Sequence, residues 1–409
     1  MTINIERVKE KHQALAQIGA LPEGGVSRLA LTKEDVEARN LLKAWIEEIG
    51  AENRMDDLGN MYGWLPGTES IDKPVVVGSH LDSVPSGGTF DGVIGVLAGL
   101  EIMTRLKEEK IQHKIPFALA NFTNEEGARF PISMIASGVL SGKYTKEEME
   151  NLTDKDGISM GEELKRFQLI GKESNRLTNL NAFAELHIEQ GPVLENENKQ
   201  IGIVSGIQGL NWYEVQVIGE ADHAGPSPME TRNDALIAAT HVIQSLHQWI
   251  RSLNDETTIT FGSMRVDPDV VNVINGKVTF TIDIRHPDAQ ILESREKEMK
   301  DRLKNILDRE PLHKWNMKTL TKMPPVQFHR PFIEQLEEIC ENKGYSYKRM
   351  ISGAGHDSMY MNDIAPTFML FVPSIGGKSH HPSEKSRWED IKVGIEVLYE
   401  WVKQNIQIV

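Results

Sequence analysis

Short apolar runs alternate with helical patterns over much of the chain. Residues 75–77 form a β-branched run opened by Pro74, which predicts a strand buried on both faces of a parallel sheet. After Asp91, apolar residues recur at helical spacing, at Val93, Val96, Leu97, Leu100, Met103 and Leu106. Further strands are predicted over residues 115–122, 183–188 and 367–372. This alternation predicts an α/β fold with a mixed, mostly parallel central sheet.

A different order of elements interrupts this pattern after about residue 210. Strand, helix, two strands, helix and strand are predicted over residues 212–218, 235–253, 257–266, 277–285, 292–307 and 316–320. This order is typical of a small ferredoxin-like α+β sandwich with one exposed sheet face. We therefore predict a main domain in two parts, at 1–208 and 324–409, with an inserted domain at 209–323. Glycine and proline residues at both junctions favour hinges there.

The ends of the first predicted strands carry side chains that bind divalent metals. His80 follows the run at 75–77, Asp91 lies in a glycine-flanked loop before a helix, and Glu125 and Glu126 follow the strand at 115–122. Because sites in open α/β sheets form outside the carboxyl ends of the strands, these side chains are expected to converge. Histidine and carboxylate ligands suit zinc, manganese or cobalt, and a second adjacent glutamate is left to move protons. The pattern predicts half of a two-metal hydrolase site.

Two later histidines fit the same logic. His187 lies at the end of the strand at 183–188, and His380 lies in a glycine-rich loop after the strand at 367–372. Any one of these histidines alone is more often a hydrogen-bonded structural residue than a ligand. The combination of strand-end histidines with Asp91 and the glutamate pair is what favours a metal centre. His381 stands next to His380, so the residues alone leave the last ligand open.

Composition narrows the classes of function. Asp and Glu total 60 against 45 Lys and Arg, a formal charge of −15, which argues against a nucleic-acid or anionic-membrane partner and favours a small-molecule substrate. No apolar run approaches the roughly 18 residues that span a bilayer, and the polar start lacks a signal-peptide core. The single cysteine, Cys340, cannot form an intrachain disulfide. We expect a cytoplasmic protein of two domains.

Seven motifs stand out over nearly the whole chain: GSHLDSVPSGGTFDGVIGVLAGLE, NEEGARF, ELHIEQGP, ADHAGPSPMETRNDA, FTIDIRHPD, SGAGHDSMYM and SHHPSE. They are similar to those of the dinuclear metallopeptidase superfamily of aminoacylases and dipeptidases. More closely, they resemble its branch of N-carbamoyl-L-amino-acid hydrolases, allantoate amidohydrolases and β-ureidopropionases.

The resemblance implies a metal centre of two divalent ions, which could be zinc, manganese, cobalt or nickel. Asp91 would bridge the two ions, and four further residues would complete the ligand set: His80, Glu126, His187 and His380. His380 is preferred to His381 because the family ligand precedes a proline by two residues. Glu125 would be the general base, and Asp82 would be the carboxylate that orients the histidine two residues before it.

The resemblance also implies substrate-binding residues. Arg285 projects from the predicted strand at 277–285, and a planar guanidinium is a natural bidentate partner for a substrate carboxylate. The alternative for Arg285 is an ordinary salt bridge to Asp283. Asn272 matches the family's substrate-binding asparagine, although Asn275 replaces the proline that usually follows.

Four more positions match the family's active site. Gln190, Gly355 and His356 correspond to residues that line the substrate pocket. His223 resembles a histidine that reaches the active site of the neighbouring subunit, where it would stabilise the developing oxyanion. The inserted domain is therefore expected to serve as a dimerisation and lid domain in a homodimer.

The function that the resemblance implies is hydrolysis of the ureido C–N bond of N-carbamoyl-L-amino acids. The products would be the L-amino acid, carbon dioxide and ammonia. Allantoate and N-carbamoyl-β-alanine are alternative ureido substrates, which the sequence separates poorly. A catalytically inactive, metal-dependent binding protein is the alternative from another class, and the intact Glu125 argues against it.

Overall fold

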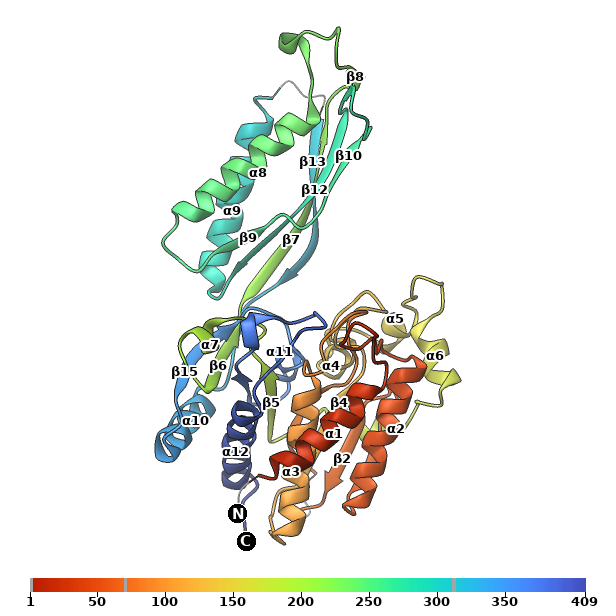
Figure 1. The fold of residues 1–409 in the computed structure, drawn as a ribbon, viewed down its shortest axis with the longest axis vertical. Coiled ribbons are helices and arrows are strands. Elements are labelled where there is room, and N and C mark those ends of the chain that lie inside the picture. Colours follow the sequence, from red (N-terminus) through yellow and green to blue (C-terminus); the bar gives the residue numbers. More distant parts are fainter. Residues whose placement is uncertain (1–2, 70–71, 311–313) are drawn as a thin grey trace. The chain divides into compact units, whose positions relative to one another are not determined.

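The computed structural model describes residues 3–69, 72–310 and 314–409. The chain divides into two compact units: unit 1 combines Met1–Ser205 with Phe328–Val409, and unit 2 is Gly206–Gln327. Unit 2 contains the insert predicted at 209–323 and a few residues on either side of it. The predicted α/β architecture with an inserted α+β domain is confirmed (Figure 1).

Unit 1 is built on a mixed sheet whose centre is parallel. The strands run in the order β1-β2-β4-β3-β5-β16-β6, with β15 paired to β6. The four central strands are parallel neighbours: β4 (Phe117–Phe122), β3 (Val75–His80), β5 (Ala182–Ile188) and β16 (Thr367–Val372). Every residue of these four strands is buried, as their continuous apolar runs predict. Two strands flank this centre and are antiparallel to it: β2 (Met61–Leu65) pairs with β4, and β6 (Ile201–Ile207) pairs with β16. Beyond them, β1 (Glu52–Met55) is antiparallel to β2, and β15 (Tyr347–Ser352) pairs with β6.

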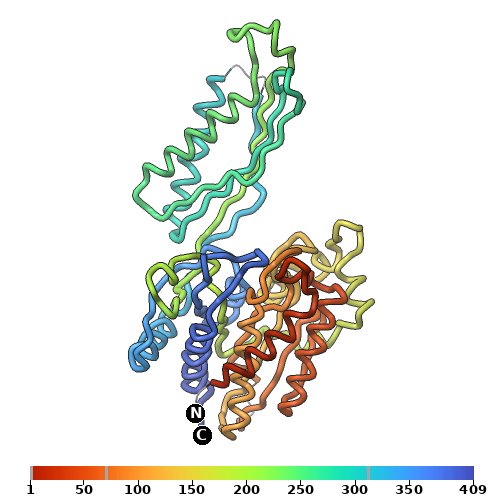
Figure 2. The backbone as a smooth tube through the Cα atoms, viewed as in Figure 1, coloured from red at the N-terminus to blue at the C-terminus, as the bar shows by residue number. Residues whose placement is uncertain are grey.

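Helices cover this sheet. The long ones are α1 (Ile5–Gln17), α2 (Lys33–Glu48), α3 (Val93–Glu108), α10 (Arg330–Lys343) and α12 (Trp388–Asn405). Short helices lie in the connections: α4 (Ile135–Leu140), α5 (Lys146–Glu150), α6 (Met160–Arg166), α7 (Val193–Asn196) and α11 (Ser358–Met361). Figure 2 shows α1 (dark red) and α12 (dark blue), from opposite ends of the chain, side by side, and both pack against α3. Because α3 is enclosed in this way, it is buried all round from Val93 to Leu106 and holds the loop before it in a fixed place.

Unit 2 has the predicted βαββαβ order. Its sheet runs β10-β12-β7-β13, entirely antiparallel, with β9 also paired to β12. The elements are β7 (Gly209–Ile218), α8 (Ala235–Ser252), β9 (Thr258–Thr260), β10 (Met264–Asp267), β12 (Lys277–His286), α9 (Ala289–Leu307) and β13 (Lys314–Met323). Two-residue strands β8 (Asp222–His223) and β11 (Val273–Ile274) pair with each other, and β14 (Val326–Gln327) pairs with β6. Alternate residues of β12 are buried beneath α8 and α9, and no helix among the described residues of unit 2 covers the other face of the sheet.

One predicted strand is wrong in its extent. Residues 257–266 do not form a single strand but two, β9 and β10, which pair with opposite halves of β12. The break falls between Thr260 and Met264, where the Ser263 carbonyl accepts the Thr281 amide and the Ser263 amide donates to the Thr281 hydroxyl. The irregular segment includes Gly262, a residue that weakens strand interiors and often marks such breaks.

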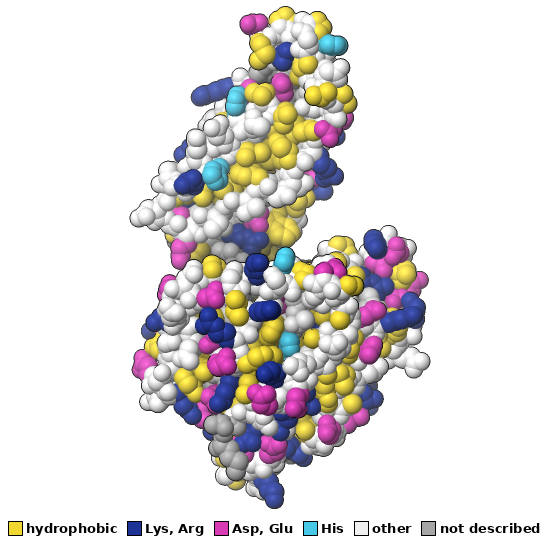
Figure 3. Space-filling model, in the orientation of Figure 1, with side chains coloured by type: hydrophobic (Ala, Val, Ile, Leu, Met, Phe, Trp, Pro, Cys, Tyr) yellow, Lys and Arg dark blue, Asp and Glu magenta, His cyan; other side chains and the backbone are white. Residues whose placement is uncertain are grey.

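None of the helices within the described residues combines the length and apolar character that crossing a bilayer requires. On the face of unit 1 drawn in Figure 3, acidic and basic side chains are interspersed. That face therefore carries no uniform block of one charge.

Candidate metal centre

The predicted ligands gather at the carboxyl ends of the four central strands of unit 1. His80 is the last residue of β3, His187 is near the end of β5, and Glu126 follows β4. His380 lies in the loop after β16, and Asp91 lies between β3 and α3. Parallel neighbours end at one edge of a sheet, so residues far apart in the chain meet there.

These side chains form two groups that share Asp91. His80 Nε2 and His187 Nε2 lie 3.5 Å and 3.1 Å from Asp91 Oδ1. His380 Nε2 lies 3.6 Å from Asp91 Oδ2 and 3.1 Å from Glu126 Oε2. Each oxygen of one carboxylate therefore faces a different group of potential ligands. A carboxylate that bridges two divalent ions needs this arrangement.

The ring nitrogens of the two buried histidines are oriented for metal binding. His80 Nδ1 donates to the Asp82 carbonyl oxygen at 2.9 Å, and His187 Nδ1 donates to the Ile188 carbonyl oxygen at 3.0 Å. Each contact fixes the ring and leaves Nε2, the nitrogen that faces Asp91, as the ligand atom. The donor set and its outer hydrogen bonds therefore fit divalent ions.

Gly92 is required by the close approach of His80. Its φ of +66° is in the left-handed region, and a Cβ atom there would lie 2.5 Å from Nε2 of the His80 ring. Any side chain at this position would displace the imidazole from Asp91. The glycine-flanked loop that the sequence shows before α3 thus has a specific steric reason.

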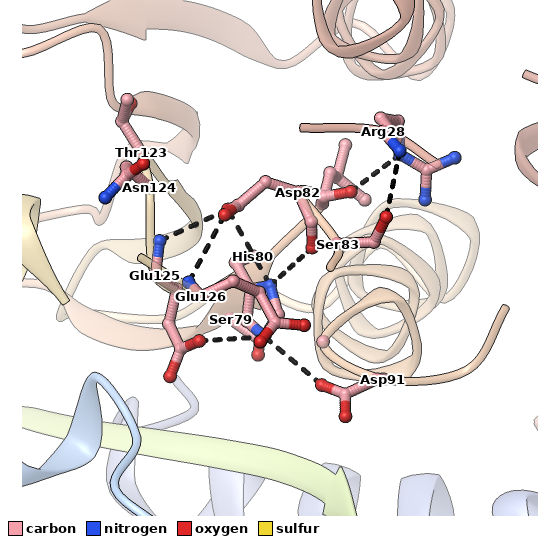
Figure 4. Close-up of polar contacts among 12 residues, drawn as sticks. Arg28, Ser79, His80, Asp82, Ser83, Asp91, Thr123, Asn124, Glu125 and Glu126 are labelled. Carbon is pink, nitrogen blue, oxygen red and sulfur yellow. Dashed lines mark hydrogen bonds and ion pairs between the residues drawn. The ribbon is translucent and has the colours of Figure 1, made fainter. Parts of the chain in front are cut away.

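The carboxylate of Asp82 fixes the backbone of Glu125 and Glu126 rather than the ring of His80. Its two oxygens accept the backbone N–H groups of Glu125 and Glu126, each at 3.3 Å (Figure 4). The carboxylate is 3.7 Å from His80 Nδ1, whose hydrogen bond goes to the Asp82 backbone instead. Burial raises the pKa of Asp82 to about 6. The residue therefore joins the end of β3 to the turn that carries both glutamates.

Glu125 points into the centre without belonging to either ligand group. It is buried, and its Oε2 lies 3.6 Å from His80 Nε2. Burial raises the pKa of Glu125 well above its ordinary value, although the nearby His80 opposes the shift. The preceding residue, Asn124, has a φ of +57°, and its side chain donates to the carbonyl oxygens of Phe130 and Ile132. This turn aims adjacent glutamates in different directions.

The structure distinguishes the two adjacent histidines. His380 reaches Asp91 and Glu126, and its hydrogen bond with Glu126 is the main cause that raises the pKa of His380 to about 9. The exposed His381 instead contacts the hydroxyl of Ser383 through Nδ1, at 2.8 Å. His380 has a left-handed φ of +53°, which turns its side chain away from that of its neighbour.

The charges of the centre depend strongly on one another. Burial lowers the pKa of His80, but the surrounding carboxylates, Glu125 foremost, raise it well above its ordinary value overall. Burial likewise opposes ionisation of Asp91, yet His187 and His80 hold the pKa of this carboxyl well below its usual range. A site that attracts protons so strongly to its histidines also attracts metal cations, which compete for the same nitrogens.

Arg28 supports the loop after β3 and was not singled out from the sequence. Its side chain is 1% exposed, and its Nε donates to the Leu81 carbonyl oxygen at 2.6 Å. Its backbone N–H donates to the hydroxyl of Ser83 at 2.9 Å (Figure 4). The side chain and the backbone of Arg28 thus together fix the segment between His80 and Ser83.

Three of the predicted substrate-binding residues lie in unit 1. Gln190 Nε2 donates to Asp91 Oδ2 at 2.8 Å, and the ring of His356 lies 4.5 Å from that of His187 between centroids. Gln190 Oε1 and His356 Nε2 are buried and lack a hydrogen-bond partner among the described residues. Burial holds the pKa of His356 well below its ordinary value, so its ring is neutral. Gly355, next to it, has the methyl group of Met134 3.1 Å from where a Cβ would lie.

The other three predicted residues lie in unit 2: Arg285 is near one end of its five-stranded sheet, and His223 and Asn272 lie in loops beyond the other end. His223 is in β8, and the backbone carbonyl of Asn272 accepts the N–H of Ala224, so these two loops are adjacent and exposed. Arg285 lies near the far end of β12, where it pairs with Leu210. Its Nη2 is 2.7 Å from Asp283 Oδ2, so the ion pair weighed as an alternative role is present.

Two further residues contact the centre and were not selected from the sequence. Ser379 Oγ lies 2.7 Å from Asp91 Oδ2, and Glu384 accepts hydrogen bonds from the Asp91 loop. Both stand in the motif SHHPSE, but nothing in the motif's spacing shows that their partners are almost three hundred residues away in the sequence.

The chain belongs to Peptidase family M20/M25/M40, whose family model matches residues 76–404. It is a hydrolase of a metal-dependent family, and its clustered histidines and carboxylates are able to bind metal.

Named relatives cover its full length. The N-carbamoyl-L-amino-acid amidohydrolase of Rhizobium meliloti is 38% identical over 407 residues, 100% of this chain and 98% of that protein. The allantoate amidohydrolase of Bacillus subtilis (strain 168) is 37% identical over 387 residues, 94% of this chain and 93% of that protein. A crystal structure of an amidase of the hydantoinase/carbamoylase family from Burkholderia multivorans matches with a TM-score of 0.93 and 39% identity, over 99% of this chain and 98% of that one. The family resemblance of the motifs is confirmed.

Proposed function

We propose that this protein hydrolyses the ureido C–N bond of N-carbamoyl-L-amino acids, giving the L-amino acid, carbon dioxide and ammonia. The observation that carries the proposal is the pair of ligand groups sharing Asp91, with Glu125 beside them and outside both. Relatives named N-carbamoyl-L-amino-acid amidohydrolase, similar to this chain over its full length, support the substrate class. The cytoplasmic location stays a prediction.

The ligand set supports two divalent ions. His80 and His187 would hold one ion, Glu126 and His380 the other, and Asp91 both. Each ion would then have three protein ligands, the number found in catalytic sites that keep a position open. Ions bound there supply Lewis acidity that lowers the pKa of a water molecule and polarises the substrate carbonyl. The softness and geometry of these ligands are compatible with zinc, manganese, cobalt or nickel.

Glu125 is the proposed general base. Its carboxylate accepts the proton of the attacking water and returns it to the departing nitrogen. The Asp82 carboxylate holds the backbone of Glu125 in place for both transfers. Burial raises the pKa of Glu125, so its carboxylate is a stronger proton acceptor than that of an exposed glutamate.

The remaining residues are proposed to bind the substrate. Gln190 and His356 offer buried polar atoms without partners among the described residues, which a ureido group would satisfy. Arg285 is assigned to the substrate carboxylate, with Asp283 holding its guanidinium. His223 and Asn272 would contact the carbonyl oxygen and the substrate backbone.

The geometry of unit 2 supports a homodimer. Eight residues of extended strand separate Lys277, at the His223 end of the sheet, from Arg285, which is a span of roughly 25 Å. A small ureido carboxylate is far shorter than that span. Arg285 and His223 of the same copy therefore do not hold one substrate molecule together. His223 and Asn272 from a second copy are not subject to this distance, because they belong to a different sheet from Arg285.

A side-by-side assay tests the proposed substrate. We expect ammonia release from N-carbamoyl-L-methionine to exceed that from N-carbamoyl-β-alanine and allantoate, and to stop when the protein is stripped of metal by a chelator. Restoring zinc, manganese, cobalt or nickel should restore turnover. Faster turnover of allantoate would assign the second candidate function, which relatives named allantoate amidohydrolase favour. Inactivity of the metal-loaded protein on every ureido or acyl substrate would favour a binding protein.

Complementation tests the shared active site. Glu125→Gln and His223→Ala homodimers are each expected to be inactive, because each lacks one component at both sites. After the two variants are mixed and their subunits exchanged, a mixed dimer has one site with both residues intact, so activity should return. Two variants of the same residue, His223→Ala and His223→Gln, provide the control mixture that stays inactive. A failure of the first mixture to regain activity, with mixed dimers present, would place His223 and Glu125 in the same subunit's site.

A further inference from the structure

Glu384 connects the two loops that close the metal centre. Its Oε1 accepts the backbone N–H groups of Phe90 and Asp91, each at 3.0 Å. Its Oε2 lies 3.0 Å from the hydroxyl of Ser379, the residue directly before His380. One side chain therefore holds the backbone that carries Asp91 and also contacts the loop that carries His380.

The surroundings of Glu384 hold its side chain in one conformation. Its side chain is 2% exposed, and Gly88 lies so close that a Cβ on Gly88 would be 2.0 Å from Oε1. The absence of a side chain at Gly88 is what lets the carboxylate reach the Asp91 loop. An acid buried in this way is kept in place by its hydrogen bonds, since an unpaired buried carboxylate is costly.

Ser379 extends the same network to the Asp91 carboxylate. Its Oγ lies 2.7 Å from Asp91 Oδ2, the oxygen that faces His380 and Glu126. Gln190 donates to the same oxygen at 2.8 Å. Asp91 Oδ1, by contrast, faces His80 and His187, which stand on strands β3 and β5. The Glu384 network thus acts on one side of the bridging carboxylate.

We propose that Glu384 is a positioning residue that sets the distance between Asp91 and His380 and thereby the affinity of the ion held by Asp91, Glu126 and His380. The proposal rests on the two-ion centre proposed above. The ion held by His80, Asp91 and His187 depends on it less, because both of these histidines are fixed by buried strands and by their own backbone hydrogen bonds. Outer residues that fix metal ligands typically change affinity by about 10- to 100-fold.

Stepwise metal titration tests this role without relying on turnover. Metal-free protein is titrated with Co²⁺, and bound cobalt is followed by its visible absorption. Wild type is expected to bind two ions in two steps. In Glu384→Ala the step that His380→Ala weakens should shift to lower affinity by about 10- to 100-fold, while the other step stays in place. Excess Co²⁺ should restore much of the lost turnover of Glu384→Ala, since the reacting groups are all present.

Three further variants separate positioning from general loss of structure. Gly88→Ala, which displaces the Glu384 carboxylate without removing it, should reproduce the weaker step of Glu384→Ala. Glu384→Gln keeps an acceptor for both N–H groups and should bind both ions as wild type does. Glu389→Gln makes the same change at an exposed residue at the start of α12 and is the matched control.

The outcomes are distinct. If Glu384→Ala and Gly88→Ala bind both ions as tightly as wild type, or lose both in equal measure with a lowered melting temperature, Glu384 has no positioning role. If Glu384→Ala does not fold, Gly88→Ala decides in the same way. If wild type itself binds fewer than two ions, the two-ion centre fails, and this inference fails with it for a different and recognisable reason.

Discussion

Glu125→Gln is expected to abolish turnover while both metal ions remain bound. The amide has the shape of the carboxylate but does not accept the proton of the attacking water, so kcat should fall by at least about 10²-fold, within the range that general acid–base catalysis contributes. Metal content should be unchanged because Glu125 belongs to neither ligand group. Ammonia release and elemental analysis of the same preparation measure the two effects.

A matched control and a contrary result define this test. Glu10→Gln makes the same change on an exposed position of α1 and should leave both turnover and metal content unaltered. Near-normal turnover of Glu125→Gln would show that another group moves the proton. Loss of metal together with activity would show instead that Glu125 is a ligand.

Asp91→Asn is expected to empty the centre. Asp91 is the one residue that both ligand groups share, and each of its oxygens faces a different group. Asparagine keeps the shape but offers one neutral oxygen and an NH₂ group that repels a cation. Affinity for both ions should fall by more than the roughly 10- to 100-fold typical of outer residues, and turnover should fall to background. Metal analysis after dialysis, followed by the ammonia assay, measures both.

The control for Asp91→Asn is Asp156→Asn, which lies at an exposed position in the connection before α6. It should retain both ions and full turnover. Retention of two ions by Asp91→Asn at wild-type affinity would contradict a bridging role, and retention of one would show that Asp91 serves a single ion.

Much of the metal centre was predictable because its residues follow buried strands. His80, Glu126 and His187 lie after or within continuous apolar runs, and the parallel order of β4, β3 and β5 brings the ends of such runs together. Asp91 reaches the same edge of the sheet through the short loop between β3 and α3. For these residues, local pattern and general sheet geometry were sufficient.

Other features depend on backbone geometry that residue patterns do not contain. The choice between His380 and His381 rests on the left-handed φ of His380, which no hydrophobic pattern encodes. Asp82 uses its carboxylate on the N–H groups of Glu125 and Glu126, and such contacts are invisible until the chain has folded. The split of residues 257–266 into β9 and β10 likewise follows from pairing with the two halves of β12.

The distance between Arg285 and His223 was also hidden in the sequence. Both stand in motifs that resemble active-site positions, and nothing in the spacing of the motifs places them at opposite ends of one sheet. The register of β12 against β7 supplies that information. The separation of these two residues gives a geometric reason, in addition to the family resemblance, to expect His223 to act in the active site of a neighbouring subunit.

The position of unit 2 within the sequence has a consequence for synthesis of the protein on the ribosome. His80, Asp91, Glu126 and His187 are translated before Gly206, whereas β16 and His380 are translated only after Gln327. A growing chain therefore carries four of the five proposed ligands while the central sheet still lacks β16. The proposed centre is completed only when the last fifth of the chain has left the ribosome, so we expect premature release to yield a protein without activity.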